Sequence, residues 1–215
     1  DVSWIKAVNT RAMEDKIFKF TVSPNPLGAR EGHISFTLGS LTETVTVKQG
    51  AGETGNMESD ARTLAAKMYA GINIGNTLEA CDNKNKIAGE TLWGNPKVSE
   101  AYVKGLKALG FNAVRIPCAW DYYIVNPSTY EIDAVWLDRV SEVVGYCVAN
   151  DMYAIVNIHW DGGWLEESIT HGYSSEVDAK QKAIWTQIAN KLNAYDEHLL
   201  FAGCNEPGQQ DQGNV

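Results

Sequence analysis

Residues 137–159 read LDRVSEVVGYCVANDMYAIVNIH, and this stretch contains the pattern that decides the fold. In its first half, apolar side chains recur at helical spacing and line one face of a predicted helix: Leu137, Val140, Val144 and Cys147. That helix is expected to stop near Asn150 and to lead into a strand over 153–158, which ends at His159. The stretch is therefore one helix followed by one buried strand, with a polar residue at the strand end.

The same unit occurs on both sides of this stretch. Upstream, a helix is predicted to start at the cap Asn95-Pro96, to close at Gly110 and to lead into a strand over 112–117. Its apolar face is expected to comprise Val98, Ala101, Tyr102, Leu106 and Leu109. Downstream, a helix is predicted from the shared face of Ile184, Ile188 and Leu192, and the strand over 199–204 leads to Asn205-Glu206. Strands that alternate with helices predict an α/β domain with a parallel sheet.

The first fifty residues have a different texture. Apolar and polar residues alternate with period two around Phe20, Ile34–Leu38 and Val45–Val47, and turn residues separate these segments. This pattern predicts a small antiparallel β-sandwich rather than a helical domain. We therefore expect a partial sandwich module over 1–50, a Gly-rich linker over 51–56, and an α/β domain over 57–215.

Composition narrows the class of partner. The chain has 215 residues and a formal net charge of −9, which repels nucleic acid and anionic lipid, so neither is expected as a partner. No apolar run reaches the length of about 20 residues that a membrane span needs. The four cysteines are far apart, so we expect free thiols and neither a zinc site nor a redox pair.

Polar side chains cluster where the predicted parallel strands end. They are Asn73 and Asn76, Arg115, His159, and the pair Asn205-Glu206. In a closed α/β barrel these ends converge on one face, where such folds place their chemistry. A carboxylic acid, hydroxyl-binding groups and aromatic rings are what a glycosidase needs, and Trp93, Trp160 and Trp164 supply the rings.

Each of these residues also has a structural interpretation. Arg115 at a strand end could be an ion-pair partner, and His159 a buried, hydrogen-bonded histidine. Glu206 before Pro207 could begin an acidic loop, and the tryptophans could be packing residues. The polar residues taken together favour an active site, but on chemistry alone several enzyme classes stay open.

Four motifs, in this order, resemble glycoside hydrolase family 5, and within it the subfamily 4 endoglucanases and xyloglucanases. They are GINIGNTLEA over 71–80 followed by ETLWGNP over 90–96, VRIP over 114–117, NIHWDGGW over 157–164, and NEP over 205–207. The resemblance covers about residues 57–210. It implies a TIM (β/α)8 barrel, of which about the first four strand-helix units are present. The N-terminal region resembles part of a small bacterial immunoglobulin-like module.

The resemblance also implies what each residue does. Glu206 would be the acid/base of a retaining hydrolase that cleaves internal β-1,4 bonds of cellulose, mixed-linkage glucan or xyloglucan. Asn205, Arg115 and His159 would complete the catalytic group, and Asn76, Trp93, Trp160 and Trp164 would contact the glucan. No metal or other cofactor is implied.

The family nucleophile is a glutamate at the end of the seventh strand, which we expect to lie beyond this chain. We therefore expect the half barrel to pair with its missing segment or with a second copy. The competing hypothesis is a non-catalytic polysaccharide-binding or inert fragment, because one carboxylate cannot complete the retaining cycle. The N-terminus lacks the basic-then-apolar pattern of a signal peptide, so the protein is either cytosolic or has lost its signal peptide. With the family resemblance, we expect a secreted, periplasmic or cell-surface enzyme whose signal peptide has been removed.

Overall fold

The computed structural model describes residues 5–7, 20–22, 30–49, 57–170, 172 and 174–206. The chain divides into two compact units, Asp1–Thr54 and Gly55–Val215. The predicted linker over 51–56 and everything after Glu206, including Pro207, lie outside the described residues.

Antiparallel pairs of strands make up the described part of the first unit. β1 (Ile5–Ala7) pairs with β2 (Phe20–Val22), and β3 (Arg30–Leu38) pairs with β4 (Leu41–Gln49). The turn between β3 and β4 contains Gly39 with φ +63°, a conformation that glycine adopts without strain. Alternation puts hydroxyl pairs such as Ser35 with Thr44 (3.1 Å) on one face of this hairpin. The antiparallel strands predicted from the period-two pattern are thus present.

A four-stranded parallel sheet organises the second unit. Its strand order is β12-β11-β8-β5, from β5 (Gly71–Asn73), β8 (Ala113–Ile116), β11 (Tyr153–Asn157) and β12 (Leu199–Ala202). Ala113 is aligned with both Gly71 and Tyr153, and Ala154 with Leu199, so all four strands run in register toward one edge. The predicted parallel sheet is confirmed.

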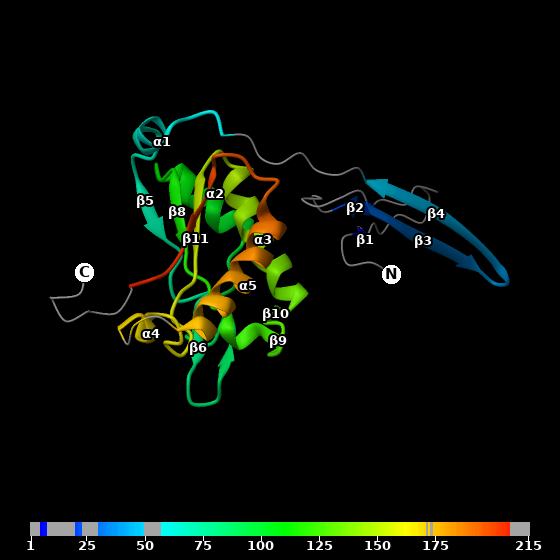
Figure 1. The fold of residues 1–215 in the computed structure, drawn as a ribbon. Coiled ribbons are helices and arrows are strands. Elements are labelled where there is room, and N and C mark those ends of the chain that lie inside the picture. Colours follow the sequence, from blue (N-terminus) through cyan, green and yellow to red (C-terminus); the bar gives the residue numbers. More distant parts are fainter. Residues whose placement is uncertain are drawn as a thin grey trace. The chain divides into compact units, whose positions relative to one another are not determined.

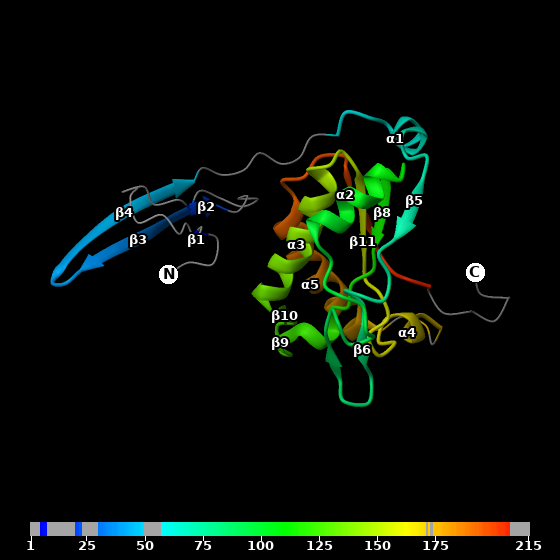
Figure 2. The ribbon, with the colours of Figure 1, turned by 180° about the vertical axis from the view of Figure 1, so that it is seen from behind.

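Three long helices cover one face of this sheet, as the two views in Figure 1 and Figure 2 show. They are α2 (Glu100–Ala108), α3 (Ala134–Val148) and α5 (Ser175–Leu192), and each connects two neighbouring strands of the sheet. The core between the layers contains Val114, Ile116, Ala154 and Val156 from the strands, and Val103, Leu106, Val140, Val144, Ile184 and Ile188 from the helices. The apolar residues that recur at helical spacing in the sequence thus form the packed face of a partial barrel.

Helix α2 corrects two details of the sequence prediction. Its N-cap is Ser99, whose side chain accepts a hydrogen bond from the Tyr102 N–H at 3.2 Å, and not Asn95-Pro96. The buried face carries Val103 and Leu106, whereas Ala101, Tyr102 and Leu109 are exposed, the last two by 46% and 77%. The helix therefore starts four residues later than predicted, at the serine whose side chain accepts an N–H group of the first helical turn.

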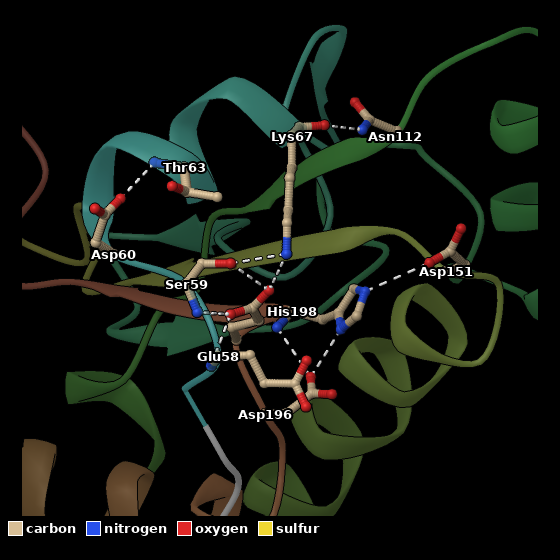
Figure 3. A network of polar contacts seen from close by, with 10 residues as sticks. Glu58, Ser59, Asp60, Thr63, Lys67, Asn112, Asp151, Asp196 and His198 are labelled. Atoms are coloured by element: carbon tan, nitrogen blue, oxygen red, sulfur yellow. Dashed lines mark hydrogen bonds and ion pairs between the residues drawn. The ribbon is translucent and has the colours of Figure 1, made fainter.

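The amino ends of the strands are closed by α1 (Ala61–Lys67) and a polar network, shown in Figure 3. Leu64 of α1 packs on Ala113 and Tyr153, on the sheet face opposite the long helices. The Glu197 carboxylate accepts hydrogen bonds from the Ser59 N–H at 2.7 Å and the Lys67 ammonium at 2.6 Å. This edge of a barrel usually contributes stability rather than chemistry.

Connections at the opposite edge are longer and form small elements of their own. β6 (Cys81–Asp82) and β7 (Ile87–Ala88) make a hairpin after β5, and α4 (Glu166–Thr170) follows β11. A short 3-10 turn over Asp121–Tyr123 precedes β9 (Ile124–Asn126) and β10 (Glu131–Ile132). In Figure 1 the hairpin and α4 lie at the carboxyl ends of the strands.

Two further expectations concern the chain as a whole. The four cysteines are free thiols, three of them buried, as predicted. Among the described residues, no helix combines the length and the apolar character that crossing a membrane requires.

Candidate active site

Backbone hydrogen bonds continue past the strand ends and keep the polar residues in one row. The Ile74 N–H donates to the Arg115 carbonyl, the His159 N–H to the Cys118 carbonyl, and the Asn205 N–H to the Ile158 carbonyl, each at 2.9 Å. The segments that carry the predicted site residues are therefore held side by side in the order of the strands. Segments about 130 residues apart in the sequence, at Ile74 and Glu206, thus lie along one edge of the sheet.

Arg115 and Asn205 are in direct contact. A guanidinium N–H of Arg115 donates to the Oδ1 atom of Asn205, whose side chain is almost fully buried. Because the carbonyl oxygen of this carboxamide faces the arginine, its NH₂ group remains as the donor that can face a ligand. The contact joins β8 to the end of β12 and fixes the orientation of the residue that precedes Glu206.

Glu206 is exposed and has a left-handed backbone with φ +33°. This conformation is uncommon for a residue with a side chain, and such outliers concentrate at active sites. It turns the chain sharply directly after the buried Asn205. The exposed carboxyl group can therefore meet a ligand while its neighbour stays anchored in the sheet.

His159 is held through Asn157, a fully buried residue that the sequence analysis did not single out. The Asn157 Oδ1 atom accepts the Cys118 N–H at 3.2 Å, so its NH₂ group is what faces His159 Nδ1, also at 3.2 Å. Nδ1 is then the acceptor and Nε2 carries the proton. Burial, and then the positive charge of Arg115, hold the pKa of His159 below its ordinary value. The ring is a neutral hydrogen-bond donor.

Asn76 lies in the turn after β5 and also has a left-handed backbone, with φ +61°. The buried Glu79 carboxylate accepts the N–H groups of Asn76 and Thr77, at 2.5 and 2.9 Å. Asn95, which was expected to cap a helix, instead donates its side-chain N–H to the Asn76 carbonyl at 3.1 Å. Glu79 and Asn95 are thus positioning residues of the turn that the sequence pattern did not reveal.

The three predicted tryptophans differ in how much surface they offer. Trp93 is 49% exposed, and its indole N–H donates to the Cys81 carbonyl at 2.8 Å, so the ring is both anchored and open. Trp160 is half-buried and packs so closely on Gly163 that a Cβ there would lie 2.5 Å from the ring. Trp164 is half-buried, and the Lys180 ammonium lies 4.3 Å from its ring centroid.

A buried acid, Asp161, organises the loop that carries Trp164. Its carboxylate accepts the Trp164 indole N–H at 2.9 Å and the backbone N–H groups of Trp120 (2.7 Å) and Asp121. Burial raises the pKa of Asp161 to about 7, although these donors favour the charged form. The loops after β8 and β11 are thereby tied together. Gly162 and Gly163, both at positive φ, leave the room that this tight turn needs.

An open cavity of about 390 Å³ lies beside this loop. Its lining comprises Gly162, Gly163, Trp164, Glu167, Ser168, Gly172, Ser174 and Val177. Trp164 therefore faces an accessible space, while Arg115, Asn205 and Glu206 belong to the neighbouring strand ends. Within the described residues, no group of three or more candidate metal ligands gathers.

Comparison with known proteins connects this geometry to two families. Residues 75–215 match the family model of cellulase (glycosyl hydrolase family 5). Residues 1–50 match that of an N-terminal putative binding domain known as BACON, so the module expected to be immunoglobulin-like is identified more specifically.

Two of the curated relatives are named as endoglucanases. The chain is 40% identical to a xyloglucan-specific endo-β-1,4-glucanase of Bacteroides ovatus, over 74% of this chain and 32% of the relative. It is 39% identical to endoglucanase B of Clostridium cellulovorans, over 76% of this chain and 35% of the relative. The chain thus spans about a third of the length of these curated relatives.

Solved structures give the same result for the fold. A family 5 xyloglucanase of Bacteroides ovatus, in complex with a XXXG heptasaccharide, superimposes with a TM-score of 0.66 at 31% identity and covers 100% of this chain and 50% of that one. A subfamily 4 endoglucanase of Ruminococcus champanellensis, with bound cellotriose, superimposes with a TM-score of 0.66 at 38% identity, over 73% of this chain and 46% of that one. The predicted barrel architecture is confirmed, and the chain belongs to glycoside hydrolase family 5.

Proposed function

We propose that the protein is a retaining endo-β-1,4-glucanase whose acid/base is Glu206. The observation that carries this proposal is the contact between Arg115 and Asn205, which fixes the residue before an exposed glutamate at the carboxyl edge of the sheet. A glycosidase needs a carboxylic acid beside the scissile oxygen and firm donors for the sugar hydroxyls. Membership in family 5 and the names of the relatives support the same reaction class.

Each residue of the group has a distinct role in this proposal. Glu206 protonates the leaving oxygen and later removes a proton from the hydrolytic water. Asn205 donates its free N–H to the 2-hydroxyl of the sugar at the cleavage point, because Arg115 already occupies its carbonyl oxygen. His159, neutral with its proton on Nε2, donates a hydrogen bond within the same site. A second carboxylate, outside the described residues, is required as the nucleophile, at about 5–5.5 Å from Glu206 in a retaining enzyme.

The proposed substrate is a β-1,4-glucan, either plain or xylose-substituted. Related structures contain cellotriose and a XXXG heptasaccharide, and a curated relative is named as specific for xyloglucan. Trp93 is the exposed ring on which a sugar can stack, and Trp164 borders the open cavity. Trp160 and Asn76 complete the proposed glucan contacts. Because such polymers are met outside the cytoplasm, we propose a secreted, periplasmic or cell-surface location.

We also propose the domain boundaries given by the sequence: a module over 1–50, a linker over 51–56 and the barrel over 57–215. Among the described strands, β5 and β12 each have a neighbour on one side only. The remaining strands of a (β/α)8 barrel would pair at these two edges. Such pairing would bring the nucleophile to the same face as Glu206.

Activity on soluble polysaccharides tests the proposal. The full-length protein is expected to release reducing ends from xyloglucan or mixed-linkage β-glucan, and Glu206→Gln to lower that rate by about 10²–10⁴-fold, since general acid catalysis contributes that much. The matched control is Glu100→Gln, which removes the same charge from an exposed position on α2 and should leave the rate unchanged. No reducing ends from any β-1,4-glucan, or equal rates for wild type and Glu206→Gln, would contradict the proposal.

A further inference from the structure

In the turn after β5, the backbone of Asn76 is held by side chains of other described residues, Glu79 and Asn95. Asn76 has φ +61°, in the left-handed region. Asparagine tolerates this region better than most residues, often because its carboxamide bonds to the local backbone. Here other side chains hold the backbone of Asn76 instead. The Asn76 carboxamide is thus not needed for these contacts that stabilise the turn.

Glu79 supplies the first of these contacts. Its side chain is buried, with the whole residue 3% exposed, and each carboxylate oxygen accepts one backbone N–H of the turn. Oε1 accepts from Asn76 at 2.5 Å, and Oε2 accepts from Thr77 at 2.9 Å. Charged acceptors give stronger and better oriented hydrogen bonds than neutral ones. One carboxylate therefore fixes two successive peptide groups.

Asn95 supplies the second contact from the opposite side. Its side-chain N–H donates to the Asn76 carbonyl at 3.1 Å. Both backbone polar groups of Asn76 are thus used, one by Glu79 and one by Asn95. Neither contact involves the Asn76 carboxamide.

Glu79 also belongs to the electrostatic surroundings of the proposed site. Its negative charge acts on the His159 ring, where it partly offsets the effects of burial and of Arg115. It acts on the buried Cys118 thiol as well. The Ile74 N–H donates to the Arg115 carbonyl at 2.9 Å and the Ala119 N–H to the Leu78 carbonyl at 3.1 Å, so the turn that contains the clamp lies next to the polar row at the strand ends.

We propose that Glu79 is a positioning residue for substrate binding, which holds the backbone of Asn76 so that its carboxamide faces a hydroxyl of the bound glucan. This inference rests on the proposed function and on the proposed contact between Asn76 and the glucan. The competing explanation is that Glu79 only satisfies two N–H groups of a buried turn. The two explanations differ in one measurable quantity, the energetic coupling between Glu79 and Asn76 in ligand binding.

A double-mutant cycle measures that coupling. Binding of cellotriose and of a xyloglucan heptasaccharide is measured by calorimetry in the full-length protein carrying Glu206→Gln, so that the ligand is not cleaved. Asn76→Ala is expected to weaken binding about 3–10-fold, the value of one hydrogen bond. Glu79→Gln keeps the size of the side chain but replaces one accepting oxygen by an NH₂ group, which cannot accept a backbone N–H. This variant should weaken binding to a similar extent.

The decisive result is the double variant. If Glu79 acts through Asn76, the double variant binds no more weakly than Asn76→Ala alone, because the contact is already lost. If the two effects multiply instead, Glu79 is merely structural and the inference is overturned. Thermal unfolding of each variant shows whether it is folded. Should Glu79→Gln not fold, Asn95→Ala removes the other side of the clamp and enters the same cycle with the same expectation.

A matched control lies in the neighbouring hairpin. Asp82 is a carboxylate that also accepts two backbone N–H groups of a turn, from Lys84 at 2.9 Å and Asn85 at 3.2 Å. Asp82→Asn should leave ligand affinity unchanged, because that turn does not hold Asn76. Failure of the parent protein to bind either oligosaccharide would overturn the proposed function itself. Binding without coupling would overturn only the role of Glu79.

Discussion

At the scale of residues, the carboxyl group of Glu166 at the carboxyl edge of the sheet makes the stability of the fold depend on pH. The residue is 3% exposed, and neither carboxyl oxygen has a hydrogen-bond partner within the described part of the chain. Burial raises the pKa of Glu166, and the charges of Glu206 and Glu167 raise it further. The native state therefore holds this proton to a higher pH than the unfolded state does. Stability is lost as pH rises above the ordinary glutamate pKa of 4.5.

We predict that Glu166→Met removes part of this pH dependence. Methionine has a similar length and no charge, so the cost of a buried, unpaired carboxylate disappears at high pH. The free energy of unfolding of the variant, relative to wild type, should rise by about 1–3 kcal/mol between pH 5 and pH 8. Urea unfolding at several pH values checks this, with Glu100→Gln at an exposed position on α2 as the control. Parallel curves for wild type and Glu166→Met would contradict it.

At the scale of elements, the segment from Glu58 to α1 is fastened to the start of β12 by one carboxylate. Glu197 accepts hydrogen bonds from the N–H groups of Glu58 (3.0 Å) and Ser59 (2.7 Å), the Ser59 hydroxyl (2.9 Å) and the Lys67 ammonium (2.6 Å). Figure 3 shows this network together with the neighbouring contacts of His198. The hydrogen bond from Lys67 is the main cause that lowers the pKa of Glu197, to about 2.

The lowered pKa of Glu197 predicts a loss of stability in acid. Since the folded pKa is below the unfolded value of 4.5, this contribution is complete above pH 4.5 and is lost as pH falls toward 2. Glu197→Gln should therefore lower the thermal midpoint at pH 7 and increase hydrogen exchange in α1, and its difference from wild type should shrink below pH 4.5. Glu100→Gln, which breaks an exposed ion pair with Lys104, should change little. Equal midpoints for Glu197→Gln and wild type at pH 7 would refute this role.

The element scale also shows what the sequence could predict. The parallel strands followed from helix-strand repeats, because buried strands and amphipathic helices have different periods. The start of α2 and the exposure of Tyr102 and Leu109 did not follow, because these depend on the N-cap Ser99 and on which turn of the helix meets the sheet. Local sequence does not contain that information.

The candidate site was predictable to a similar extent. Arg115, His159 and Asn205-Glu206 could be found because each lies within four residues of the carboxyl end of a parallel strand. Glu79 and Asn157 were missed, since the contacts that give them a role, to Asn76 and to His159, only exist once the turns are folded. Trp164 was predicted as an aromatic contact for the glucan. Its cation–π contact with Lys180 joins residues sixteen positions apart and cannot be read from a local motif.

At the scale of the whole molecule, the described part of the barrel contributes one of the two carboxylates that the proposed reaction needs. Glu206 stands at the fourth parallel strand, beside Asn205 and Arg115. The acid/base of a retaining enzyme has a distinctive property: it is needed to expel a poor leaving group, and dispensable for a good one. A substrate whose leaving group requires no proton can therefore separate the role of Glu206 from general damage to the site.

The most direct test uses the full-length Glu206→Ala variant with dinitrophenyl β-cellobioside, with and without azide. We expect rapid release of dinitrophenol in the first turnover, slow turnover afterwards, and acceleration by azide with β-cellobiosyl azide as the product. In that reaction azide replaces the water that Glu206 would have activated, and retention follows from two displacements. Turnover that azide does not change, together with wild-type rates on polymeric β-glucan, would contradict the assignment of Glu206 as the acid/base.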